Sequence, residues 1–290
     1  SFRSDYGSRW DGRVHLRGCT LRPTGEGRVA VLQYNPQDFD YQYQIGYGRD
    51  IEIQDLRIDY AAAPASTAPC WLMQVADFSR TSNGSRLFFP KRIGLRRIHV
   101  GGRGQGGRLL RLPDPSHFDL GAEGGEADGL LRSNCEITCD DVHLERVTPG
   151  ADVAGSAHLV IGSVDAVGTA DANALIPKLH FSNCDGLVVT LLDCAASVLF
   201  ERCVINLVRA PGLHGDLSFA DCRMRPDVAD AMEGDFYETD VSSGTRFTNC
   251  TLHAPVVDGH VAPELVDRMG IVQVNGVVRH YHLNTGLGGE

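Results

Sequence analysis

A pattern of alternating apolar and polar positions recurs along the chain. In LHFSNCDG (179–186), apolar and polar residues alternate, and a cysteine follows a polar residue. With that cysteine as position 0, the template has apolar residues at −5, −3 and +2 and a polar residue or glycine at −1; in this copy Gly186 holds +2. The same template fits eight segments, in which Thr245 is the one −5 residue that is not apolar. Their anchors at position 0 are Cys19, Leu56, Ile98, Val142, Cys184, Cys203, Cys222 and Cys250. The chain is therefore built on an internal repeat.

Each copy predicts a strand, a bend and a second short strand. The alternation before the anchor is typical of a strand, and the inward side changes from odd to even positions across the polar −1 residue. If copies stack in parallel, equivalent positions form ladders spaced by ~4.8 Å. One ladder would hold Phe181, Phe200, Phe219 and Phe247, and another Cys184, Cys203, Cys222 and Cys250. We therefore interpret these cysteines as small buried hydrophobes rather than redox or metal groups.

The spacing between anchors divides the chain into two parts. The steps are 37, 42, 44 and 42 residues up to Cys184, and then 19, 19 and 28. Either every second turn of the first part has lost its signature, or each turn carries an excursion. We prefer excursions, because Gly, Pro, Asp and Ser are frequent in 35–50, 61–69, 76–92, 101–107, 113–134 and 148–156. Apolar stretches at 28–34, 70–75, 108–112 and 157–164 are candidates for further strands of the same turns.

The eight copies resemble the right-handed parallel β-helix proteins of the pectin-lyase-like superfamily, which includes phage tailspikes. The resemblance implies an all-β chain: a right-handed parallel β-helix (solenoid) of about eight or more rungs over 1–266. A C-terminal β-hairpin is expected in 267–290, where Asn275-Gly276 suits a type I′ turn, and would cap the solenoid or serve oligomerisation. Phage spikes of this fold are commonly homotrimers, so the resemblance implies that this chain forms a homotrimer. The fold hosts lyases, hydrolases, epimerases and adhesins, so it does not choose a function.

Charge and hydropathy argue against two classes of partner, nucleic acids and membranes. The net charge of −10 disfavours nucleic acid, whose phosphates require clustered Lys and Arg. No apolar run has the ~18–20 residues of a membrane-spanning helix, and the first residues lack the apolar core of a signal peptide. The missing signal peptide and the unpaired cysteines favour synthesis in a bacterial cytoplasm. The resemblance to phage spikes then implies assembly into a virion or other extracellular particle.

The outward positions of the repeat bring titratable residues together. Position +1 aligns Arg57, His99, His143 and Asp185, while position −2 aligns Arg96 with Asp140, and Glu145 follows His143 by two residues. A glycosidase needs two carboxylates, ~5 Å apart if retaining or ~6.5–9.5 Å apart if inverting. The candidate catalytic residues are Asp140, Asp185, His143 and His99, and Arg96, Arg57 and Glu145 are candidates for substrate binding. The alternative is a solvated face with opposite charges on neighbouring strands.

Two further segments could contact ligands. The stretch 34–48 is rich in aromatic residues, and Tyr41, Tyr43 and Tyr47 could stack on sugar rings or close the end of the core. The acidic segment 226–240 could bind Ca²⁺, but its spacing is not that of an EF-hand, and a solvated helix and loop fits better. We predict no metal site and no cofactor.

Three functions therefore compete. The first is a tailspike-like or tail-fibre-like virion protein that recognises a bacterial surface glycan, as a homotrimer with other virion proteins. The second is a polysaccharide-cleaving enzyme, a glycoside hydrolase or lyase, on the same scaffold. The third is a purely structural virion or surface component.

Overall fold

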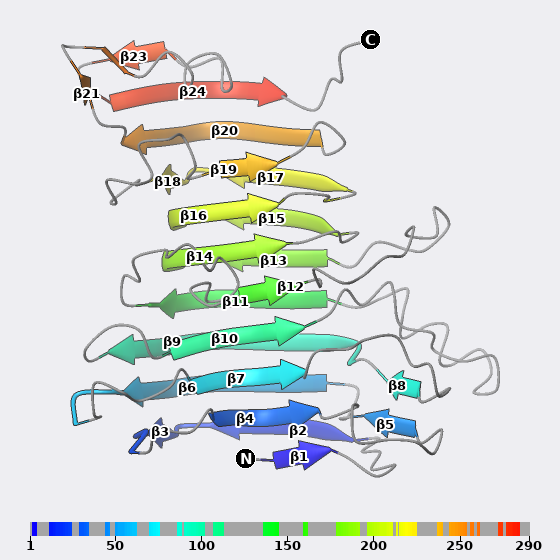
Figure 1. Cartoon of the computed structure of the whole chain (residues 1–290). Helices are drawn as coiled ribbons and strands as arrows, with labels where there is room; N and C mark the ends of the chain where they lie inside the picture. Colours follow the sequence, from blue (N-terminus) through cyan, green and yellow to red (C-terminus); the bar gives the residue numbers. More distant parts are fainter. Residues whose placement is uncertain are drawn as a thin grey trace.

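The computed structural model is all-β over the residues that it describes. These are 2–4, 12–24, 29–34, 44–46, 50–62, 70–75, 86–88, 90–101, 107–112, 136–144, 159–161, 178–191, 196–210, 213, 215–224, 237–239, 244–253, 256–257, 260–261, 272–274 and 277–284. No helix suited to crossing a membrane occurs in these ranges. The strands lie in layers across one long axis, and the chain advances from one end to the other (Figure 1). Most of the pairing is parallel, and the sheet is not closed, an arrangement compatible with a β-helix.

The strands before each bend form the first ladder. Its members are β2 (Arg13–Arg17), β6 (Asp50–Asp59), β9 (Arg92–Gly101), β11 (Glu136–His143), β13 (Lys178–Ser182), β15 (Ser197–Glu201), β17 (Asp216–Ala220) and β20 (Gly244–His253). Each pairs in parallel with the next, with Leu56 opposite Ile98 and Ile98 opposite Val142. Consecutive copies are therefore hydrogen-bonded neighbours, in the register that the aligned repeats predict.

The bend at position −1 has a left-handed backbone in every copy. The seven described non-glycine residues with positive φ are Asp55, Arg97, Asp141, Asn183, Arg202, Asp221 and Asn249, with φ between 49° and 56°. Gly18, with φ 67°, holds the same position in the first copy. Asp, Asn and Gly tolerate this conformation better than other residues. The predicted bend is confirmed, and these eight residues form what we name the bend column.

A second ladder follows the bend. It contains β3 (Thr20–Leu21), the ends of β6, β9, β11 and β20, the starts of β14 (Asp185–Leu191) and β16 (Val204–Ala210), and β18 (Arg223–Met224). The register of β14 against β16 shifts around Leu187. Gly186 lies there with φ 81°, and a Cβ on it would lie 2.4 Å from the Leu144 carbonyl oxygen. Only glycine fits this position without moving the backbone.

A third ladder is built from the remaining apolar stretches. It contains β1 (Phe2–Ser4), β4 (Val29–Tyr34), β7 (Cys70–Val75), β10 (Gly107–Leu112), β12 (Leu159–Ile161), the ends of β14 and β16, and β19 (Tyr237–Thr239). The stretches at 28–34, 70–75, 108–112 and 157–164 therefore supply third strands of the same turns.

Part of the expected irregular excursions is regular. β5 (Gln44–Gly46) and β8 (Arg86–Phe88) pair in parallel as a small separate sheet. Our assignment of 35–50 and 76–92 to loops was wrong at these two strands. Their pairing shows that excursions from successive turns also stack on each other.

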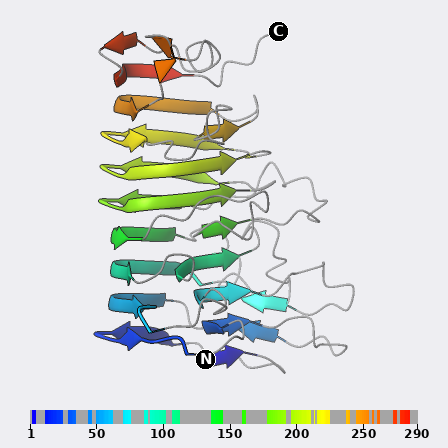
Figure 2. The ribbon, with the colours of Figure 1, turned by 60° about the vertical axis from the view of Figure 1, so that its left-hand side comes forward.

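Antiparallel strands follow the last parallel turn. β24 (Val277–Asn284) pairs with β20 and with β23 (Val272–Val274), while β21 (Val256–Val257) pairs with β22 (His260–Val261). β24 therefore covers the edge of β20 that the parallel stack leaves (Figures 1 and 2). Asn275 and Gly276, on which the predicted turn rests, lie outside the described residues.

The core lies between the ladders. The rings of Phe181 and Phe200 stack with centroids 4.6 Å apart, and those of Phe200 and Phe219 stack at 5.1 Å. All three are at most 1% exposed. The predicted phenylalanine ladder is confirmed for these three; Phe247 pairs with Phe219 in the backbone register, and its side chain lies outside the described part.

Candidate functional site

The residues predicted at position +1 lie on adjoining strands. Arg57 is paired with His99, His99 with His143, and His143 with Asp185. All four side chains are exposed. The position forms a solvent-facing column that crosses four turns.

Asp140 is the most heavily engaged carboxylate of the predicted set. Its Oδ1 accepts hydrogen bonds from Ser182 Oγ at 2.8 Å and Asn183 Nδ2 at 3.1 Å, and its Oδ2 lies 3.4 Å from Arg96 Nε. Partial burial opposes ionisation, but the two hydrogen bonds and the positive charge of Arg96 outweigh it and lower the pKa of Asp140. A general acid of a glycosidase needs a raised pKa. Asp140 is therefore suited to hold a negative charge, not to donate a proton.

His143 is oriented by a residue of the bend column. Its Nε2 lies 2.9 Å from Asp141 Oδ1, and both side chains are about half exposed. A carboxylate that holds one ring nitrogen of a histidine leaves the other nitrogen for a proton transfer or a ligand contact. Of the predicted residues, His143 therefore has the partner most compatible with acid–base chemistry.

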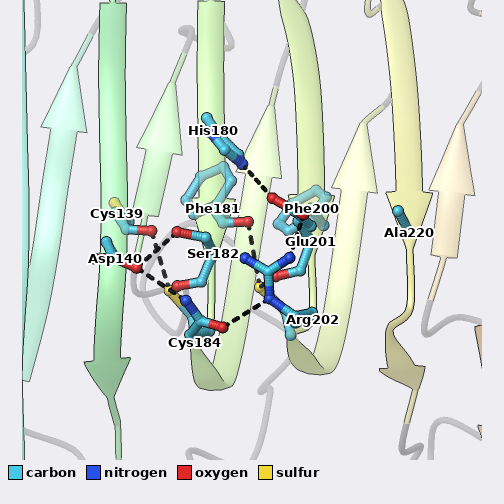
Figure 3. A network of polar contacts seen from close by, with 12 residues as sticks. Cys139, Asp140, His180, Phe181, Ser182, Cys184, Phe200, Glu201, Arg202 and Ala220 are labelled. Atoms are coloured by element: carbon cyan, nitrogen blue, oxygen red, sulfur yellow. Dashed lines mark hydrogen bonds and ion pairs between the residues drawn. The ribbon is translucent and has the colours of Figure 1, made fainter.

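A polar network extends from Asp140 across the next turns (Figure 3). Asn183 Oδ1 accepts a hydrogen bond from Arg202 Nε at 3.0 Å, Arg202 also contacts Glu201, and Glu201 lies 3.2 Å from His180 Nε2. Figure 3 shows the side chains of His180, Glu201 and Arg202 on one face of neighbouring strands. His180, Asn183 and Arg202 were not predicted from the sequence, because only positions −2 and +1 were expected to face outward.

A second network lies nearer the N-terminus. Asp55 accepts hydrogen bonds from Arg97, including Arg97 Nη2 at 3.0 Å, and from Arg17 Nε at 3.3 Å. The hydrogen bonds from Arg97, with a smaller contribution from Arg17, lower the pKa of Asp55 to about 2. The polar residue at −1, already visible in the repeat, was the signal that could have identified this network.

The cysteine anchors face the core and hydrogen-bond to the backbone. Cys203 Sγ lies 3.4 Å from the Phe181 carbonyl oxygen and 3.3 Å from that of Glu201, and Cys184, Cys222 and Cys250 repeat this arrangement. None of the seven cysteines in the described ranges forms a disulfide. Burial raises the pKa of Cys139 well above its ordinary range and that of Cys70 to about 11. These two thiols, neither of which is an anchor of the repeat, are therefore poor nucleophiles.

Several predicted residues lie outside the described part of the chain. These are Glu145, Tyr41, Tyr43, Tyr47 and, from the acidic segment, Asp227, Asp230, Glu233, Asp235 and Asp240. Within the described ranges, no group of three or more His, Cys, Asp and Glu side chains is arranged to hold a metal ion. No family model, curated protein or solved structure matches the chain.

Proposed function

We propose that this chain is a right-handed parallel β-helix of the pectin-lyase-like type that recognises a bacterial surface glycan. On this proposal it belongs to the tailspike or tail fibre of a phage-like particle and works there as a homotrimer with other virion proteins. The stacked strand–bend–strand repeats support the fold. The function rests on one observation: an exposed polar column runs along successive turns at position +1, beside the ion pair of Arg96 and Asp140.

The column suits an extended polymer better than a small molecule. Its residues repeat with the strand spacing of ~4.8 Å, so a linear glycan lying along the axis would meet a polar group on each turn. Arg57 and His99 offer donors at one end, and Asp185 offers acceptors at the other. The lowered pKa of Asp140 supports recognition over cleavage, because it disfavours a general-acid role.

Cleavage is the second candidate, and one contact favours it. His143 is held by Asp141 and neighbours Asp185 on the next turn, so a base and a carboxylate lie on adjoining strands. A polysaccharide lyase or hydrolase would use His143 for proton transfer.

The experiment is a panel of bacterial surface polysaccharides, assayed for binding and for release of reducing ends or unsaturated sugars. Wild type is compared with His143→Ala, Asp140→Asn and Asp185→Asn, and with Asp216→Asn as a matched control on a distant turn. Recognition predicts binding that weakens about tenfold or more in the three site variants and not in the control. Released product that disappears in His143→Ala would instead establish an enzyme. A folded protein that binds no glycan, with no difference among variants, would overturn both candidates and leave the structural one.

The homotrimer is tested separately by sedimentation equilibrium of wild type. A trimer would support the spike assignment, whereas a monomer at micromolar concentration would contradict it.

A further inference from the structure

The column at position +1 carries charges of opposite sign at its two ends. Arg57 begins the four-turn column and Asp185 ends it, and His99 and His143 lie between them. All four side chains are exposed to solvent. With one strand spacing of ~4.8 Å per turn, the two charged ends are three steps, or ~14 Å, apart.

The two end charges have no partner in the part of the chain that the structure describes. Of the exposed arginines there, Arg57 and Arg223 alone form no ion pair. The others each lie within 4.0 Å of a carboxylate; they are Arg13, Arg17, Arg22, Arg92, Arg96 and Arg202. The carboxylate of Asp185 likewise has no hydrogen bond or ion pair to a described residue, in contrast to Asp140 and Asp141. Both charges are therefore available to a ligand.

The surroundings of Arg57 are positive. In the adjoining bend column, the single carboxylate of Asp55 is shared by Arg97 and Arg17. Two guanidinium groups on one carboxylate leave an excess of positive charge beside Arg57. This end of the column therefore attracts an acidic group.

The surroundings of Asp185 do not offset its charge. The bend residue of the same turn, Asn183, is uncharged. It accepts a hydrogen bond from Arg202, but Arg202 is itself paired with Glu201. This end of the column therefore attracts a cationic group.

The two ends together discriminate among glycans by charge. A polymer with an acid on every sugar would satisfy Arg57 but place a like charge against Asp185, which weakens its binding. A pyranose with its linkage is about as long as one strand spacing, ~4.8 Å, so an extended glycan along the column presents about one sugar to each turn. Three steps is an odd number, so a polymer that alternates acidic and amino sugars meets both ends with the complementary charge.

We propose that the column selects a zwitterionic glycan, in which a sugar carboxylate contacts Arg57 and a free amino group three sugars further along contacts Asp185. The inference rests on the proposed function, because it names the class of glycan that the same column recognises. The guanidinium fork of Arg57 can bind a carboxylate through two parallel hydrogen bonds, and an ammonium group can donate to the carboxylate of Asp185. His99 and His143 face the two sugars between these contacts.

The probe is a polysaccharide of alternating glucuronate and N-acetylglucosamine, prepared in four matched forms. These are the acidic parent, the zwitterionic form obtained by N-deacetylation, the neutral form obtained by carboxyl reduction, and the cationic form that carries both changes. Binding to the full chain is measured by calorimetry at a mildly acidic pH that protonates the amino groups. The zwitterionic form should bind about threefold to tenfold more tightly than each other form, and added salt should reduce the difference.

Charge reversals test the two contacts one by one. Arg57→Glu and Asp185→Lys should each weaken binding of the zwitterionic form by about tenfold, since an attraction becomes a repulsion. The double variant Arg57→Glu/Asp185→Lys should recover to within about threefold of wild type, because the polymer can shift by one sugar and meet the exchanged charges in the opposite order. The matched control, Lys178→Glu/Asp216→Lys, exchanges two exposed charges outside the column and should keep the order of the four probes.

The outcomes separate this inference from the proposed function. Equal binding of the four forms, no binding of the zwitterionic form, or a double variant as weak as the single ones would overturn the inference. The proposed function survives any of these if a panel polysaccharide binds and its binding weakens in His143→Ala. It fails if no glycan depends on the column. Circular dichroism checks that each variant folds, and the four probes with wild type decide the question if one variant does not.

Discussion

Two groups of turns have the same backbone conformation at the bend but differ in the side-chain interactions around it. One group has aliphatic anchors, at Leu56, Ile98 and Val142, and the other has cysteine anchors, at Cys184, Cys203, Cys222 and Cys250. In both groups the bend is left-handed and the anchor points inward. Around the aliphatic anchors, charges cross the bend column, as in the pair of Asp55 and Arg97. Around the cysteine anchors, side-chain amides of the bend column form hydrogen bonds. Asn183 bridges Asp140 and Arg202, and Asn249 donates to Asp221.

The inside of the bend differs as well. Each thiol of the later turns points at a carbonyl oxygen of its own turn and at one of the turn before, as Cys222 does with Ala220 and Phe200. Leu56, Ile98 and Val142 have no donor to offer at the same position. The comparison shows that the inward anchor position requires a small or medium-sized apolar side chain. The hydrogen bonds from a thiol to the backbone at the bend are not required there.

The largest effect on stability is expected when an aromatic ring is removed from the later turns. Phe200→Ala should lower the free energy of unfolding by about 3–5 kcal/mol, because it opens a cavity and breaks two ring stacks. Its counterpart Leu95→Ala should cost less, since no ring stack is lost. Urea unfolding with native-state hydrogen exchange measures both, because stacked turns need not open as one unit. A cost below about 1 kcal/mol for Phe200→Ala, as small as for the outward Leu199→Ala, would contradict the ladder.

A smaller effect tests the thiol hydrogen bonds. Cys203→Val keeps an apolar side chain at the anchor position, where Val142 already stands in an earlier turn. It removes the thiol that donates to the carbonyl oxygens of Phe181 and Glu201. We expect a loss of about 1 kcal/mol in unfolding free energy. The reverse change, Val142→Cys, should cost less, because the new thiol meets equivalent carbonyls. The loss of unfolding free energy is measured for both variants by thermal and urea unfolding. Equal losses for Cys203→Val and Val142→Cys would show that side-chain volume alone determines which residue the anchor position accepts.

The smallest effect concerns charge in the earlier turns and depends on pH. The folded pKa of Asp55, about 2, lies below its ordinary value of 3.8, so its stabilisation is complete above that value. The stabilisation is lost as the pH falls towards about 2, because the unfolded state then binds the proton more readily. Asp55→Asn keeps a residue that tolerates the bend and should flatten this part of the stability curve. The check is the unfolding midpoint of both proteins measured across this pH range; parallel curves would refute the prediction.

Much of the fold was visible in the sequence because strand repeats have a fixed period. Inward residues of stacked copies must coincide, so the anchors predicted the register that pairs Leu56 with Ile98 and His143 with Asp185. The polar residue at −1 predicted the bend. The strands β5 and β8 were missed, because their three residues each are too short to show a period.

The candidate site was only partly predictable. Alignment placed Arg96 beside Asp140, and the structure has them 3.4 Å apart. It did not reveal that Ser182 and Asn183 also donate to Asp140, or that His143 is held by Asp141. These contacts depend on side-chain direction at the left-handed bend, where the simple alternation of inward and outward positions fails.

The sequence by itself determined the repeat, the inward ladders of phenylalanine and cysteine, and the position of the bend, because burial imposes the same apolar period on every copy. Only the tertiary structure decided the partners of the charged groups. Most of the described ion pairs join residues of different turns, often about forty positions apart, as Arg97 and Asp55 are. Their protonation and roles follow from distances across the sheet, which no spacing along the chain specifies.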